Sequence, residues 1–197
     1  MDKQTVSVYD NQVEEYARLT QSQPVGPSLN EFISRITPGG LVLDLGCGPG
    51  SESAAMIEHG LRADPVDASE QMVLAANEKY AIGARQACFE DIKEHNHYDG
   101  VWANFSLLHA AKVDFEPILQ SLARSLKSHG YLCLGMKLGK DSHRDKLGRF
   151  YTYYSEQELE ACLDRAGFKP EKRWKGETEG LAGDVEPWIV LLSQLAS

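Results

Sequence analysis

An apolar run that leads into three closely spaced glycines most constrains how this chain can fold. The run Leu41-Val42-Leu43 is followed by Asp44 and Leu45 and then by Gly46, Gly48 and Gly50. Apolar runs of this kind are typical of strands buried on both faces of a parallel sheet. Glycines let the backbone turn sharply and approach a ligand, because no Cβ stands in the way. A helix predicted from about residue 51 to 59 would point its unpaired N–H groups into the same space. Strand–glycine–helix units bind nucleotide-like ligands at the carboxyl end of such sheets.

The spacing of these glycines differs from the dinucleotide fingerprint G-x-G-x-x-G/A, because the third glycine comes one residue early. An acid, Asp44, also stands two residues before Gly46. A carboxylate at that point would repel a pyrophosphate but would suit a ligand that carries an ammonium or sulfonium group. A tight turn that binds no ligand remains the alternative interpretation.

The rest of the chain alternates between predicted strands and helices, which indicates an α/β fold with a doubly wound parallel sheet. The predicted strands cover residues 41–45, 62–66, 84–89, 101–105, 131–137, 168–174 and 187–192. The last two are joined by residues 175–186 without a helical pattern, whereas a parallel pair would need a crossover. We therefore expect a mostly parallel, seven-stranded, Rossmann-like sheet that ends in an antiparallel hairpin.

The N-terminal segment has an amphipathic pattern. Tyr9, Val13 and Tyr16 fall at i, i+4 and i+7, which predicts one helix with an apolar stripe. The two tyrosines could cover a cationic ligand by cation–π contact, and plain core packing is the alternative. Ser28 and Glu31 have the spacing of a capping box for the next helix. We expect one domain over residues 1–197, with residues 1–26 as a possible helical lid.

Composition narrows the classes of partner. With 197 residues, of which 42% are hydrophobic, the chain can bury a substantial core. A formal net charge of −9 argues against a nucleic-acid partner, which needs a basic patch. No run of roughly 18 apolar residues predicts a membrane span, and the polar start lacks a signal-peptide core. The four cysteines lack metal-site spacing, so we expect reduced thiols in a cytoplasmic protein that binds no metal.

Two further acids are placed to meet a nucleoside. Asp67 comes 21 residues after Gly46 at the end of a predicted strand, where an acid can accept ribose hydroxyls. Ser69 then caps the next helix, so a favourable charge at a helix N-terminus is an equally good explanation of Asp67. Asp91 follows the third predicted strand and, taken alone, reads as part of a solvated turn.

The segment D-L-G-C-G-P-G, residues 44–50, resembles motif I of the class I S-adenosylmethionine-dependent methyltransferases. The ribose acid, the acid after the third strand, the 106–109 loop and the hairpin ending follow in the family's order, over residues 40–192. This resemblance implies S-adenosylmethionine as the cofactor, S-adenosylhomocysteine as the product, and direct displacement of the methyl group. It also implies that Asp91 accepts the adenine amino group while the N–H of Ile92 faces the ring. The cofactor-binding residues implied are Asp44, Gly46, Cys47, Gly48, Gly50, Asp67, Ala68, Met72, Asp91, Ile92 and Asn104.

The acceptor side is less defined. The tetrapeptide that begins at Asn104 lacks the proline pair of relatives that methylate nucleic-acid bases, whereas residues 106–109 resemble a loop of small-molecule methyltransferases. We therefore expect a small-molecule acceptor. His109 is the candidate general base, and a loop histidine that shapes the pocket is the alternative. The candidate acceptor-binding residues are Tyr9, Tyr16, His109, Arg149 and Tyr151, with His143, Arg144 and Tyr153 nearby in the sequence.

Arg149 would suit a carboxylate or phosphate on the acceptor. The competing interpretation of this segment is that the tyrosines are core residues and the charges are solvated. The other functions considered are a tRNA or protein methyltransferase, an NAD-dependent oxidoreductase, and a cofactor-binding module without catalysis. The acceptor atom and the oligomeric state do not follow from the sequence.

Overall fold

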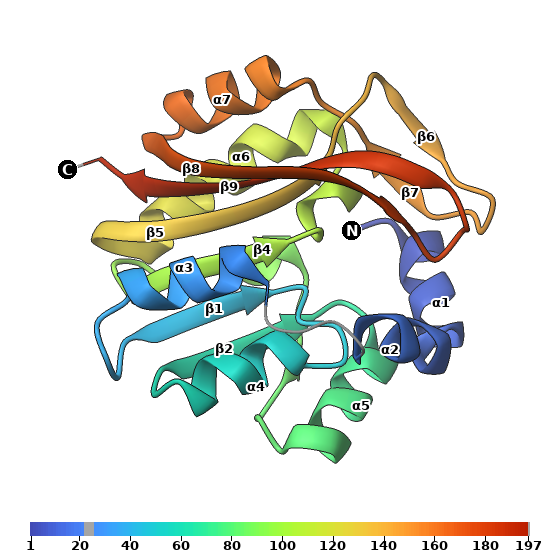
Figure 1. The fold of residues 1–197 in the computed structure, drawn as a ribbon, viewed down its shortest axis with the longest axis horizontal. Helices are drawn as coiled ribbons and strands as arrows, with labels where there is room; N and C mark the ends of the chain where they lie inside the picture. The colour runs from blue at the N-terminus through green and yellow to red at the C-terminus, as the bar shows by residue number, and fades with distance from the viewer. Residues whose placement is uncertain (22–25, 197) are drawn as a thin grey trace.

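A seven-stranded sheet forms the centre of the computed structural model, which describes residues 1–21 and 26–196. The strand order is β3-β2-β1-β4-β5-β9-β8 (Figure 1). The strands are β1 (Leu41–Leu45), β2 (Arg62–Asp67), β3 (Arg85–Gln86), β4 (Tyr98–Asn104), β5 (Leu126–Lys137), β8 (Phe168–Glu179) and β9 (Val185–Leu195). The predicted fold class is confirmed.

The first five strands of the sheet run parallel, and the last two form the antiparallel ending. β1 pairs in parallel with β2 and β4, while β9 pairs antiparallel with both β5 and β8. The hairpin is longer than predicted, because much of the polar segment 175–186 continues the two strands and leaves only a short turn. Backbone pairing, rather than an apolar pattern, extends the strands there.

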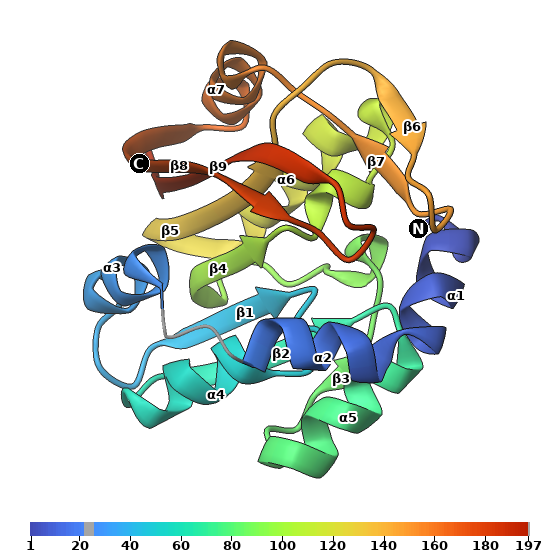
Figure 2. The same ribbon diagram turned by 45° about the vertical axis from the view of Figure 1, so that its right-hand side comes forward.

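Helices cover both faces of the sheet (Figures 1 and 2). On one face, α3 (Pro27–Arg35) and α4 (Ser51–Glu58) enclose a core that includes Phe32, Met56 and Trp102. On the other face, α6 (Lys112–Ser125) and α7 (Glu156–Arg165) pack over a larger core. α5 (Glu70–Tyr80) connects β2 to β3, and Ser69 caps it as predicted. The side chains of β1 alternate between the two cores, as a strand buried on both faces requires.

The N-terminal segment is two helices and not one, which corrects the prediction. α1 (Lys3–Asn11) ends before Gln12, and α2 (Val13–Gln21) begins directly after it. The amphipathic spacing holds across the break, since the rings of Tyr9 and Tyr16 still meet. The two helices lie beside α5 at the carboxyl edge of the sheet (Figure 2). Residues 22–25 of the predicted lid lie outside the described residues.

Three smaller predictions are also corrected. The third strand is only two residues long, because residues 89–91 turn into a 3-10 helix. The predicted loop 139–149 contains β6 (Ser142–Arg144), which pairs with β7 (Phe150–Thr152) in a separate small sheet. α3 begins at Pro27 with Gly26 as its N-cap and no side-chain cap, so the capping box at Ser28 is absent.

Two expectations concern membranes and thiols. Within the described residues, no helix is both long and apolar enough to cross a membrane. All four cysteines are free, and Cys47, Cys133 and Cys162 are buried, as the sequence predicts.

Candidate functional site

The turn after β1 folds back onto the end of β2. Gly46, Gly48 and Gly50 all adopt positive φ angles of 85°, 51° and 85°. The N–H of Gly48 donates to Oδ2 of Asp67 over 2.9 Å, which joins the turn to the tip of the neighbouring strand. A Cβ at Gly46 would lie 2.4 Å from Cβ of Ser106, so only glycine permits this close approach to the end of β4.

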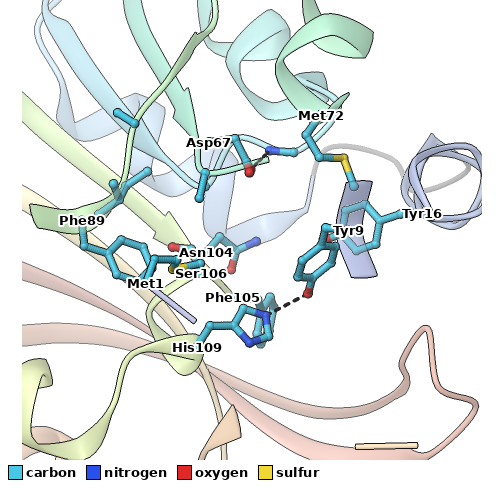
Figure 3. A pocket seen from close by; sticks show the side chains of 15 residues that line it. Met1, Tyr9, Tyr16, Asp67, Met72, Phe89, Asn104, Phe105, Ser106 and His109 are labelled. Atoms are coloured by element: carbon cyan, nitrogen blue, oxygen red, sulfur yellow. Dashed lines mark hydrogen bonds between the residues drawn. The ribbon is translucent and has the colours of Figure 1, made fainter. Parts of the chain in front are cut away.

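A small cavity of about 50 Å³ lies over this turn, at the carboxyl ends of β1, β2 and β4 (Figure 3). Its walls come from the glycine turn, the ends of three strands and the two N-terminal helices. They are formed by Met1, Tyr9, Tyr16, Leu45, Gly46, Gly48, Asp67, Ala68, Met72, Ala87, Phe89, Asn104, Phe105, Ser106 and His109. Parallel sheets of this topology place their ligands at this edge.

Asp67 is the acid that faces the cavity. Its Oδ2 accepts the N–H of Gly48, and its Oδ1 accepts the N–H of Ser69 over 2.9 Å. Burial raises the pKa of this carboxyl, although the backbone hydrogen bonds oppose the rise. Each carboxylate oxygen has a further lone pair, so the group can also accept hydroxyl groups from a ligand.

Tyr9 and Tyr16 close the cavity from the N-terminal helices, and His109 meets Tyr9 from the 3-10 turn at residues 107–109 (Figure 3). The Nδ1 atom of His109 lies 2.6 Å from the carbonyl oxygen of Phe150 and must donate to it. In the neutral ring Nε2 is then an acceptor, and the hydroxyl of Tyr9 donates to it over 2.8 Å. Burial lowers the pKa of His109 to about 3, so the ring is neutral near pH 7.

Arg149 stands behind this contact and does not line the cavity. It is 2% exposed, it pairs with Asp145 over 2.7 Å, and its Nη1 donates to the hydroxyl of Tyr9 over 3.1 Å. Tyr151 is also buried and packs against the ring of His109 at a centroid distance of 4.6 Å. The guanidinium is therefore occupied by a partner from its own loop, and both residues support the wall from outside.

The structure brings together part of the predicted cofactor set. Besides Asp67, the predicted residues that line the cavity are Gly46, Gly48, Ala68, Met72 and Asn104. Asp44 lies outside the lining; its carboxylate is 1% exposed and accepts from the hydroxyl of Ser53 over 2.6 Å.

The remaining predicted residues also lie outside the lining. Asp91 is exposed and accepts the N–H of Cys88 over 2.8 Å, which caps its own 3-10 turn. Ile92 is buried beside the adjoining groove, and Gly50 is enclosed by Ala76 and Ile82. The three acids at the strand ends therefore do not converge on one cavity, because only Asp67 reaches it.

Sequence reasoning missed several members of the lining, among them Met1, Phe89, Phe105 and Ser106. Phe105 adopts φ +57° at the end of β4, which is unusual for a residue with a Cβ. The sequence carried one usable signal for Phe89, since the residues just after a strand tip are the ones that reach the ligand edge.

A wider groove of about 740 Å³ adjoins the cavity between the 3-10 turn at residues 89–91 and α6. Met1, Phe89 and His109 belong to both walls, so these side chains separate the two spaces. Its lining combines apolar side chains such as Ile92 and Ile118 with charged ones such as Asp114 and Arg124. The cavity therefore has a neighbouring space large enough for a second small molecule.

Residues 42–130 match a family model described as a methyltransferase domain. Among curated proteins, the cypemycin N-terminal methyltransferase of a Streptomyces species is 33% identical over 132 residues, which are 63% of this chain and 54% of that protein. An uncharacterized methyltransferase of Staphylococcus carnosus is 26% identical over 132 residues, covering 66% of this chain and 61% of the relative. The chain thus spans little more than half the length of these curated relatives.

Solved structures share the fold. The 1,6-didemethyltoxoflavin-N1-methyltransferase of Burkholderia thailandensis, with 1,6-didemethyltoxoflavin and S-adenosylhomocysteine bound, superposes with a TM-score of 0.75. The match covers 98% of this chain and 88% of that one at 17% identity. At this identity the similarity concerns the fold.

Proposed function

We propose that the chain belongs to the class I family of S-adenosylmethionine-dependent methyltransferases and that it transfers the methyl group of the cofactor to a small-molecule acceptor. Support comes from residues 42–130, which match a methyltransferase-domain model, and from the fold, which the chain shares with S-adenosylmethionine-dependent methyltransferases. The reaction is a direct displacement at the sulfonium methyl. Such a step depends mainly on holding the acceptor atom and the methyl group close and aligned. The protein's role is then to bind the cofactor and the acceptor, to orient them towards each other and to exclude water.

The observation that carries this proposal is the set of polar groups over the glycine turn. Asn104 Oδ1 and Ser106 Oγ are buried without a hydrogen-bond partner in the described part of the chain, and both residues line the cavity. Buried polar atoms are nearly always hydrogen-bonded, so we take a bound ligand to be the partner of these two atoms. Asp67 would hold the ribose, and Gly46 and Gly48 leave room for the ligand's amino-acid end.

The cavity is smaller than the roughly 300–1,000 Å³ of most small-molecule sites. An adenosyl ligand therefore has to displace side chains, and Tyr9 and Tyr16 belong to the helices that close the cavity. We accordingly propose a lid within one methyltransferase domain over residues 1–197, formed by the two helices over residues 3–21 of the predicted lid segment 1–26. The contact between Tyr9 and His109 is the point at which this lid meets the end of β4.

We propose His109 as the general base, with Tyr9 as the group that reaches it. Burial lowers the pKa of His109 to about 3 in the closed cavity, so this role requires that ligand binding displaces the side chains that bury the ring. The Tyr9 hydroxyl already donates to Nε2, so a proton leaving the acceptor can pass to Tyr9 as Tyr9 passes its own to His109. The step is balanced in charge: a bond forms between the acceptor atom and the methyl carbon, the sulfonium becomes a neutral thioether, and His109 becomes an imidazolium.

The net charge of −9 and the adjoining groove support a small molecule as the acceptor. A peptide amine is the alternative, since the curated relative from Streptomyces is named for methylation of an N-terminus. Free cysteines are typical of reducing compartments, and we place the protein in the cytoplasm.

Thermal unfolding with candidate ligands tests the proposal. S-adenosylmethionine and S-adenosylhomocysteine should each raise the melting temperature, whereas NAD should not. Stabilisation by NAD alone would overturn the assignment in favour of an oxidoreductase.

A turnover assay identifies the class of acceptor. Release of S-adenosylhomocysteine should be followed with a panel of small amines, phenols and acids, with a peptide that has a free N-terminus, and with tRNA. Turnover only with the peptide or only with tRNA would overturn the small-molecule acceptor, and cofactor binding without any turnover would indicate a binding module.

A further inference from the structure

Glu52 is a buried acid that the sequence motifs do not single out. It lies in the first turn of α4, directly after the glycine turn, and it does not line the cavity. Its Oε2 accepts the indole N–H of Trp102 and its Oε1 accepts the amide of Asn104, both over 3.0 Å. Burial raises the pKa of this carboxyl. Glu52 therefore acts on the cavity only through its neighbours on β4.

The acids around the glycine turn lack a positive partner. Among residues 1–21 and 26–196, no lysine, arginine or histidine forms an ion pair with Asp44, Glu52 or Asp67. Burial raises the pKa of Asp44, and the charges of Glu52 and Asp67 raise it further. Buried carboxylates normally have a cationic partner or a metal ion. The site is thus short of positive charge, which a bound ligand can supply.

Asn104 has a fixed orientation because of Glu52. An ionised carboxylate only accepts hydrogen bonds, so Asn104 must turn its NH₂ group towards Glu52. Its Oδ1 is then the free end, and this atom is buried without a partner. Gly135 on β5 makes room for it, because a Cβ there would lie 2.3 Å from Oδ1. Glu52 thereby decides that Asn104 offers the cavity an acceptor and not a donor.

Ser106 gives a second, independent indication of a missing ligand. The residue is 8% exposed, its Oγ has no partner in the described residues, and it lines the same cavity. The Oδ1 atom of Asn104 is a hydrogen-bond acceptor that lies near several acids. A ligand group with N–H donors and a positive charge would therefore fit this position. A primary ammonium has both, whereas a sulfonium has no proton to donate.

We propose that Glu52 is a positioning residue for the α-ammonium group of the adenosyl ligand. It holds Asn104 with Oδ1 free for the ammonium, and together with Asp44 it supplies the negative charge that the ammonium neutralises. This assignment rests on the proposed function and extends it to the recognition of the ligand's amino-acid end. It separates ligands that carry the ammonium from nucleosides that lack it.

Calorimetry with two nucleosides tests the assignment. S-adenosylhomocysteine carries the α-ammonium, and 5′-methylthioadenosine lacks the whole amino-acid end. Glu52→Gln keeps the shape, but its NH₂ group forces the carboxamide of Asn104 to flip. The affinity for S-adenosylhomocysteine should fall about tenfold or more, the worth of one hydrogen bond to a charged group, while the affinity for 5′-methylthioadenosine should stay within about twofold. Glu58→Gln on the same helix is the matched control and should change neither affinity.

A merely structural role of Glu52 gives a different pattern. Equal losses for both nucleosides, or no loss for either, would overturn the assignment while leaving the proposed function intact. A wild-type protein that binds neither nucleoside would instead remove the proposed function itself. Asn104→Ala should show the same selective loss, and the double variant should lose no more than either single one, because the two residues act as one unit. Additive losses would contradict the assignment.

A measurement on the wild-type protein keeps the test independent of folding defects. The ratio of the two affinities should fall as the pH is lowered from 8, because burial raises the pKa values of Asp44 and Glu52 and these carboxyls therefore take up protons earlier than exposed ones do. The other titratable groups near Glu52 are Tyr16, Cys47 and Cys133, whose pKa values are all raised, so they stay neutral throughout. A ratio that does not change with pH would overturn the assignment.

Discussion

Asp67 and Asp91 show how local geometry separates two acids that follow successive strands. Asp67 lies at the end of β2, where two backbone N–H groups hold its carboxylate beside the cavity. Asp91 ends a 3-10 turn, and its carboxylate turns back onto the N–H of Cys88. The sequence places both acids at the same edge, but only the turn geometry decides which one can meet a ligand.

Matched substitutions at these two acids should have unequal effects. Asp67→Asn removes the charge that the ribose hydroxyls would meet, and it should weaken S-adenosylhomocysteine binding by about 1.5–3 kcal/mol. Asp91→Asn should leave that affinity within about 0.5 kcal/mol. Isothermal calorimetry on both variants measures the difference. A comparable loss at Asp91 would restore its predicted contact with the adenine amino group.

Gly48 and Gly60 form a second matched pair. Both have positive φ angles, 51° and 83°, so alanine strains the backbone at either site by about 1–2 kcal/mol. A Cβ at Gly48 would meet Tyr16 at 3.4 Å inside the cavity, whereas nothing lies within 4 Å of a Cβ at Gly60. Gly48→Ala should therefore lose ligand affinity as well as stability, and Gly60→Ala should lose stability only. Equal affinities of the two variants would make the turn purely structural.

His109 should make the protein less stable in acid. Its pKa in the folded state, about 3, lies below the ordinary value of 6.5, so the unfolded chain binds the extra proton first. The stabilisation is complete above about pH 6.5 and is lost as the pH falls towards 3, by at most about 1.4 kcal/mol for each pH unit. Asp44, Glu52 and Asp67 have raised pKa values and act in the opposite sense.

The contribution of His109 to the free energy of unfolding is therefore measured as the difference between the wild type and a variant without the imidazole ring. Urea unfolding of the wild type and of His109→Gln at several pH values should give curves that converge as the pH falls from 6.5 to 4. The variant lacks the titrating ring, while the other groups contribute to both curves alike. Parallel curves would mean that His109 is not held neutral.

Single residues also mark where prediction from the sequence stops. Gly46, Gly48, Asp67 and Asn104, which are predicted from the sequence to bind the cofactor, line one cavity, and their contact with the cofactor stays a prediction. The sequence does not predict that Asp145 occupies Arg149, because that pairing depends on the fold of the loop between β6 and β7. The role proposed for Glu52 is not predictable for a related reason, because it depends on which side chains of β4 lie opposite α4.

At the scale of elements, strand existence is predictable and strand length is not. Apolar runs locate central strands such as β1, β4 and β5, because burial on both faces leaves a clear signal. β2 and β3 contain exposed polar residues, and their prediction depends on the alternation of strands and helices. β8 and β9 extend through polar residues, since cross-strand hydrogen bonds need no apolar side chains. β6 and β7 escape prediction because two three-residue strands carry little pattern.

The attachment of α1 to this small sheet gives a prediction about the lid. Thr5 is fully buried; its Oγ1 accepts the N–H of Phe150 over 2.8 Å and donates to Asp2 over 2.7 Å. Thr5→Val has the same shape but leaves that N–H without a partner, at a cost of about 1–3 kcal/mol. Amide hydrogen exchange over residues 3–21 should become faster, while exchange in β1 and β4 should not change.

Lys3→Ala, at an exposed position on the same helix, is the control and should leave these exchange rates unchanged. S-adenosylhomocysteine should slow exchange over residues 3–21 in the wild type if the two helices close over the ligand. Ligand protection confined to the glycine turn would show that these helices are not a lid.

The whole molecule combines a family fold with an acidic surface, and the two together limit the acceptor. The sheet order and its antiparallel ending determine where a cofactor can lie, but a fold of this kind supports many reactions. The chain has 29 acidic and 20 basic residues. This charge balance limits which partners can bind, and not where the cofactor lies. Many of the basic side chains are also committed to ion pairs, such as those of Arg144 with Asp2 and Arg173 with Glu156.

This charge balance predicts that tRNA does not bind under physiological conditions. Even non-specific binding, with a Kd of about 10⁻⁴–10⁻⁶ M, relies on lysines and arginines that neutralise phosphates and release counterions. Bulk tRNA titrated into the protein at about 150 mM salt should cause no shift in a gel or filter assay up to tens of micromolar. At about 50 mM salt the result should be the same, because weaker screening also strengthens the repulsion between the phosphates and the excess of acidic residues. Micromolar binding with a steep salt dependence would instead make a nucleic acid the acceptor, and the adjoining groove would then lose its role as the acceptor site.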